Sequence, residues 1–147
     1  MKVSLVQMNT QNDKAENLKV AADLIEKAVK ADNPDLVVLP EYFAFLGDNP
    51  REMHESGEEF PGGEIYTLLS GLAKKHAITL HAGSIVEKEG NRFYNSTLVF
   101  GPDGKQIARY RKIHLFDVDT PNGISYRESD SVARGEEVVT YKVGDKT

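Results

Sequence analysis

The chain of 147 residues contains no cysteine. A disulfide framework, a thiolate metal site and a thiol nucleophile are therefore excluded within these residues. No apolar run approaches the roughly 18 residues that a membrane-spanning helix needs, and Met1-Lys2 leads into a strand-like stretch instead of the apolar core of a signal peptide. We therefore expect a cytoplasmic protein with no membrane partner.

An excess of positive charge is also lacking, since 18 basic residues face 23 acidic ones and the formal net charge is -5. Nucleic-acid binding needs a clustered positive field, and the densest basic cluster, at 109–112, is equally well explained as a solvated strand. Hydrophobic residues make up 39% and charged residues 28%, which is typical of a globular domain. We expect one domain over residues 1–147 and a small-molecule partner.

The first half of the sequence alternates strand and helix patterns. A strand over 3–8 is followed by a helix that Asp13 caps and Asn33-Pro34 ends, and then by a branched apolar strand over 36–39. This order predicts two parallel neighbours in a sheet, joined by a right-handed crossover. After a polar surface excursion over 47–63, helical spacing resumes from Ile65 to Ala73.

The second half predicts antiparallel strands joined by turns, over 78–86, 92–100 and 105–111. Residues 113–136 show no clean period and are expected to form an ordered loop that lines a site. A further strand over 137–143 precedes the turn signal Gly144-Asp145, and no later strand is available to pair with it. This unpaired edge predicts that the chain is one part of a longer protein.

Two charged residues follow predicted strands. Glu41 stands just beyond the strand that Pro40 ends, where nearby aromatic side chains could desolvate a carboxylate and make it a useful base. Lys112 follows the last strand of the antiparallel group, where an ammonium could stabilise an oxyanion. Each has a simpler interpretation as a solvated surface residue.

Other chemistries have weaker support. His114, Asp117 and Asp119 could suggest a metal site, but their spacing matches no closed zinc or calcium pattern. The sequence contains no Gly-x-Ser-x-Gly elbow, P-loop or Gly-x-Gly-x-x-Gly segment, so Ser84 and Ser96 are interpreted as structural.

Four motifs together resemble the nitrilase superfamily of carbon–nitrogen hydrolases, most closely its branch of ω-amidases and deaminated-glutathione amidases. They are LPEYF at 39–43, YNS at 94–96, YRKIHLFD at 110–117 and GISYRES at 123–129. The resemblance implies an α/β fold, the N-terminal part of an α-β-β-α sandwich with a mixed sheet and helices on one face. It also implies no cofactor, and a homo-oligomer that pairs through its outer helices.

The same resemblance assigns a Glu-Lys-Cys triad. Glu41 matches the general base, Lys112 the cation that stabilises the tetrahedral intermediate, and Glu128 the second glutamate that orients lysine and substrate. The matching cysteine would lie beyond Thr147. The expected activity is hydrolysis of a small carboxamide with release of ammonia. The alternatives are an inactive truncated homologue acting as an interaction module and, more remotely, a metal-dependent hydrolase.

Overall fold

The computed structural model describes residues 1–147, all of the chain. Its elements in chain order are β1 (Val3–Leu5), α1 (Lys14–Asp32), β2 (Leu36–Val38), α2 (Pro50–Glu55), α3 (Gly63–His76), β3 (Thr79–His81), β4 (Ile85–Glu89), β5 (Arg92–Phe100), β6 (Gln106–Arg111), β7 (Asp117–Asp119), β8 (Ser125–Arg127) and a 3-10 turn (Glu128–Asp130). No helix is long and apolar enough to cross a bilayer.

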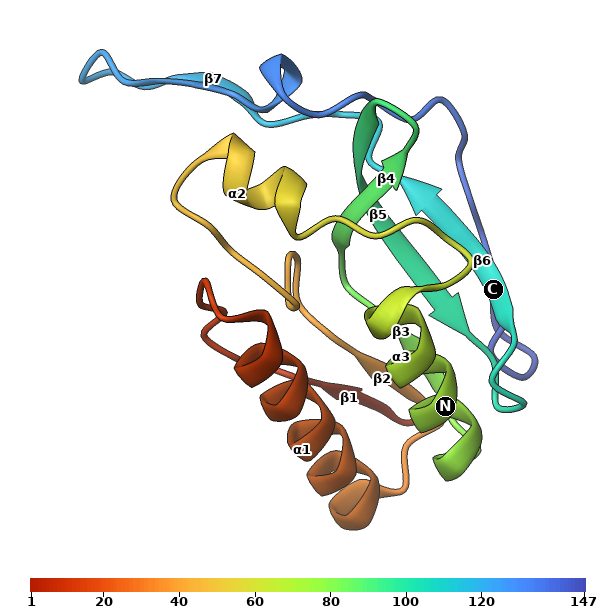
Figure 1. Ribbon diagram of the computed structural model, residues 1–147. Coiled ribbons are helices and arrows are strands. Elements are labelled where there is room, and N and C mark those ends of the chain that lie inside the picture. Colours follow the sequence, from red (N-terminus) through yellow and green to blue (C-terminus); the bar gives the residue numbers. More distant parts are fainter.

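Six strands form one mixed sheet in the order β1-β2-β3-β5-β4, with β6 on β5 as well. Strands β1, β2 and β3 are parallel, while β5 pairs antiparallel with β3, β4 and β6. Helices α1 and α3 lie side by side over one face of this sheet (Figure 1). The mixed α/β fold with helices on one face is confirmed.

Local sequence explains the two long helices. Asp13 caps α1 by accepting a hydrogen bond from the amide of Glu16 at 3.0 Å, and Asn33 ends the helix in a left-handed conformation. Glu58 accepts from the amide of Ile65, at 3.0 Å to Oε2, in the first turn of α3, whose own N-cap is a glycine. Both expected helices are therefore confirmed.

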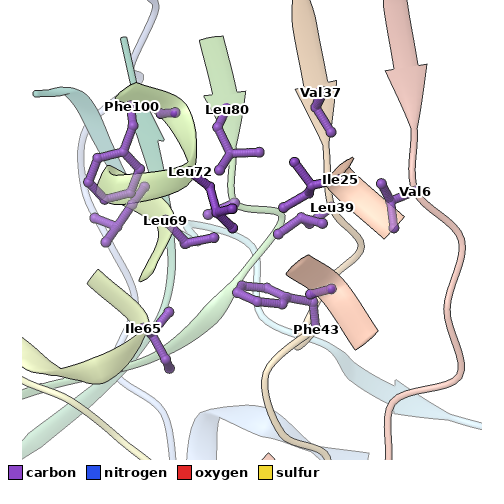
Figure 2. Packing of buried hydrophobic residues seen from close by; sticks show 14 of the residues in the cluster. Val6, Ile25, Val37, Leu39, Phe43, Ile65, Leu69, Leu72, Leu80 and Phe100 are labelled. Carbon is purple, nitrogen blue, oxygen red and sulfur yellow. The ribbon is translucent and has the colours of Figure 1, made fainter. Parts of the chain in front are cut away.

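The core lies between α1, α3 and the sheet. Ile25 from α1, Leu69 from α3 and Val37 from β2 are fully buried, and Phe43 closes the cluster where the chain leaves β2 (Figure 2). Leu80 of β3 also points into this core, so the next residue, His81, points to the opposite face.

That opposite face is partly covered by the C-terminal segment. His81 Nδ1 lies 2.9 Å from the hydroxyl of Tyr141, and burial lowers the pKa of this histidine. At the other end of the sheet the side chain of Leu5 remains 78% exposed.

The structure corrects four sequence-based expectations. The surface excursion over 47–63 contains α2, and the loop over 113–136 contains the β7–β8 hairpin. The strand expected over 78–86 is two strands, interrupted at Gly83. Residues 137–143 form no strand, because no neighbouring strand bonds to them and only Val143 makes a bridge, to Lys146.

A buried carboxylate ties the antiparallel strands together. Glu87 in β4 is 1% exposed and accepts hydrogen bonds from Ser96 Oγ at 2.6 Å and Arg111 Nη2 at 2.5 Å. Arg111 Nε adds a contact at 3.0 Å, and Arg109 Nη1 adds one at 3.1 Å. These donors offset the cost of removing the carboxylate from water.

Candidate active site

Glu41 is held by the interruption between β3 and β4. Pro40 has no amide hydrogen to continue strand pairing, and its carbonyl accepts from the Ser84 amide at 3.3 Å. The Tyr42 amide donates to Ser84 Oγ at 3.1 Å. Gly83 has φ +55°, and a Cβ there would overlap the Pro40 carbonyl oxygen. The glycine therefore permits the close approach that fixes the turn bearing Glu41.

Lys112 is fixed through its backbone on both sides. Its amide donates to the Asn95 carbonyl in β5 at 2.9 Å, and its carbonyl accepts from the Gly135 amide at 2.9 Å. Glu128 begins the 3-10 turn after β8, and its Oε2 accepts from the Phe116 amide at 2.7 Å. The β7–β8 hairpin thus returns Glu128 to the end of β6.

The three residues expected at the site meet in space. Lys112 Nζ lies 3.2 Å from Glu41 Oε1 and 2.9 Å from Glu128 Oε2. An ammonium has three N–H donors, so one remains for a further acceptor after these two contacts. The arrangement can hold a cation beside two carboxylates and still offer a hydrogen bond to an oxyanion.

The expectation that aromatic side chains desolvate Glu41 is wrong for this structure. The Glu41 side chain is 57% exposed, whereas those of Lys112 and Glu128 are 26% and 13% exposed. Phe43 turns into the hydrophobic core instead, and the Tyr42 hydroxyl donates to Glu128 Oε1 at 3.0 Å. Glu128 is therefore the more buried of the two carboxylates.

The sequence did not identify Asn95 as a site residue. This side chain is 3% exposed, and its Nδ2 donates to Glu41 Oε1 at 2.7 Å and to Glu128 Oε1 at 3.2 Å. Its position within the YNS motif was the available signal, but strand patterning alone cannot distinguish a functional asparagine from a structural one.

Hydrogen bonds set the charge states at the site. Burial raises the pKa of Glu128, but bonds from the Phe116 amide, Lys112 and Asn95 outweigh it and hold that pKa below its ordinary value. Burial likewise lowers the pKa of Lys112, and its bonds to Glu128 and Glu41 raise it above the ordinary value. The pair is therefore ionised at neutral pH. Burial and the neighbouring carboxylate raise the pKa of Tyr42, which stays a donor.

A cavity of about 440 Å³ opens beside the three charged groups. Its size suits a small molecule. Apolar and polar side chains both line it, among them Leu46, Met53, His54, Phe116, Tyr126 and Arg127. A second hollow of about 300 Å³ shares Glu41 and Lys112 with the first and extends along Ser84, Asn95 and Tyr110. The charged pair thus stands where two hollows adjoin.

The residues of the alternative chemistries are engaged elsewhere. Asp119 pairs with Arg127 at 2.7 Å and Asp117 accepts from the Ser129 amide at 3.1 Å, both within the hairpin region. No group of three or more His, Cys, Asp or Glu side chains is placed to hold a metal ion. Ser84 and Ser96 serve the backbone turn and the Glu87 cluster.

Known proteins resemble this chain along nearly its whole length. Omega-amidase NIT3 of Saccharomyces cerevisiae is 42% identical over 147 residues, covering 95% of this chain and 50% of that protein. Omega-amidase NIT2 of Homo sapiens is 36% identical over 143 residues, with the same two coverages, 95% and 50%. The chain therefore spans about half the length of these relatives.

The fold comparison agrees. The crystal structure of Saccharomyces cerevisiae Nit3, a member of branch 10 of the nitrilase superfamily, superposes with a TM-score of 0.84 at 34% identity, covering 98% of this chain and 52% of that one. The carbon-nitrogen hydrolase family matches residues 2–146. This protein chain therefore belongs to the carbon-nitrogen hydrolases of the nitrilase superfamily.

Proposed function

We propose that the chain supplies the Glu-Lys-Glu part of an amidase site that hydrolyses a small carboxamide and releases ammonia. The observation that carries this proposal is the contact of Lys112 Nζ with both Glu41 and Glu128 beside a cavity of about 440 Å³. Relatives named omega-amidases support an amide at the end of a small carboxylic acid as the substrate class.

In the proposed reaction, a cysteine thiolate attacks the amide carbonyl, after Glu41 has taken the thiol proton. The oxyanion accepts a hydrogen bond from the remaining N–H of Lys112. The C–N bond then breaks, and ammonia leaves with the proton that Glu41 had taken. The acyl group remains on the cysteine sulfur as a thioester. Water gives a proton to Glu41 and attacks the thioester, releasing the acid and restoring the thiol. No cofactor takes part in this proposed reaction, and the cysteine is not among residues 1–147.

Glu128 has a separate role in this proposal. Its enclosed carboxylate receives bonds from Lys112, Asn95 and Tyr42, so it orients the lysine and stays ionised. Glu41 is the more exposed of the two and the better placed for proton exchange with substrate and water. The proposal also includes a cytoplasmic homo-oligomer acting on a small-molecule amide.

A test is ammonia release by the protein isolated from its own cells, with the monoamide of a short dicarboxylic acid as substrate. The intact mass of the same sample, compared with 16.3 kDa, shows whether further residues accompany the chain. Release of ammonia that a thiol-alkylating reagent abolishes supports the proposal. A larger protein that releases no ammonia from any of a series of such monoamides overturns it.

The second candidate is an inactive homologue acting as an interaction module. The exposure of Leu5 in β1, at 78%, is the observation that favours it. An isolated mass of 16.3 kDa, together with self-association and no ammonia release, would select this candidate.

A further inference from the structure

Asn95 lies next to the charged groups in a strand that is paired on both sides. It lies within β5, opposite Val86 of β4, and its carbonyl accepts from the Lys112 amide at 2.9 Å on the other side. Its side chain is 3% exposed. Because strands on both sides hold its backbone, the direction of its side chain is fixed by the sheet and not by a loop.

The amide of Asn95 meets both carboxylates. Its nitrogen has two N–H donors, and the two acceptors within reach are Glu41 Oε1 at 2.7 Å and Glu128 Oε1 at 3.2 Å. The opposite amide orientation would place its oxygen against two carboxylate oxygens, so the network itself settles which atom faces them.

Charge explains why a neutral donor is needed there. Two carboxylates share one ammonium at this point, which leaves a surplus negative charge. An amide supplies two more N–H contacts without adding charge of its own. Glu41 is 57% exposed and has only Lys112 and Asn95 as side-chain partners, so without Asn95 its carboxylate is free to turn toward water.

We propose that Asn95 is a positioning residue that holds Glu41 and Glu128 at a fixed separation around Lys112, so that Glu41 stays within reach of the reacting proton. This inference rests on the proposed function. In the active enzyme, Asn95→Leu should lower kcat on the order of 100-fold, as displacement of a reacting group by about 1 Å can do. KM should change far less, since Asn95 does not line the cavity of about 440 Å³ proposed to hold the substrate.

The deciding experiment follows the glutamate carboxyl carbons by NMR during a pH titration of the chain. In Asn95→Leu the pKa of Glu128 should rise, because one of its donors is lost. Asn17→Leu is the matched control. Asn17 is also a 3% exposed asparagine, but its amide bonds to the carbonyls of Gln11 and Ala44, so its loss should not move Glu128.

A second variant keeps the test decisive if Asn95→Leu does not fold. Asn95→Asp has nearly the same shape but replaces the donors with a third carboxylate, so the pKa of Glu128 should rise further. An unchanged Glu128 titration in the folded variants overturns the positioning role. This titration needs no activity, so it separates that failure from a failure of the proposed amidase function, which a lack of ammonia release by the unsubstituted enzyme would reveal.

Discussion

Glu41 and Lys112 are separated by 71 positions in the chain, yet Lys112 Nζ lies 3.2 Å from Glu41 Oε1. If this pair performs proton transfer and oxyanion stabilisation, Glu41→Gln and Lys112→Ala should each reduce kcat for ammonia release by roughly 100-fold or more. Glu55→Gln and Lys105→Ala are matched controls, because both side chains are exposed, at 62% and 82%. Normal ammonia release by both site variants would refute the assignment.

Gly83→Ala should destabilise the protein and displace Glu41, because a Cβ would overlap the Pro40 carbonyl. Gly90→Ala is the control, since Gly90 has a similar φ, +59° against +55°, but apart from its chain neighbours no atom lies within 4 Å of the position that a Cβ would take. The free energy of unfolding of the control should fall only by the cost of placing an alanine in the left-handed conformation, about 1–2 kcal/mol. Urea unfolding should show a larger loss for Gly83→Ala, and equal losses would exclude the steric explanation.

Glu87→Gln should cost about 1–3 kcal/mol of unfolding free energy, because the buried side chain at this position loses its charge-assisted hydrogen bonds from Arg109 and Arg111. Glu89→Gln removes an exposed partner of Arg111 and should cost less than about 1 kcal/mol. Chemical denaturation of the two variants measures the difference. Similar losses would mean that the burial of Glu87 has no energetic consequence.

Stability should depend on the ionisation of Glu128. Its pKa in the folded chain lies below the ordinary value, so the unfolded state takes up protons first as the pH falls. The contribution is fully present above the unfolded value, about 4.3, and is lost as the pH drops through the lower folded value. The stability difference between the unsubstituted chain and Glu128→Gln should therefore shrink on acidification. Parallel pH curves would contradict this.

The sequence predicted the elements whose evidence is local. The cap at Asp13, the turn before the strand at 92–100 and the apolar spacing of α1 and α3 are all short-range signals, and the parallel pairing of β1 with β2 follows from the helix between them. The motif resemblance assigned Glu41, Lys112 and Glu128 to one site, and in the structure Lys112 contacts both glutamates.

Long-range contacts account for what the sequence did not predict. The stretch over 78–86 was predicted as one strand, and it divides at Gly83 because the chain at Pro40 approaches closely there. Residues 137–143 have strand-like composition but no partner, and a strand is stabilised by its neighbour and not by composition alone. The role of Asn95 depends on two carboxylates, 54 and 33 positions away in the chain.

Strand β5 pairs with β3, β4 and β6, so it connects the parallel strands with the antiparallel strands of the sheet. Successive side chains of a strand point to opposite faces, so a one-residue insertion or deletion within β5 ahead of Asn95 would send its amide to the other face and bring a neighbour to the carboxylates. Length changes during evolution should therefore be tolerated in turns such as 101–104 and excluded from β5. The number of residues in β5 therefore determines which side chain faces the two carboxylates.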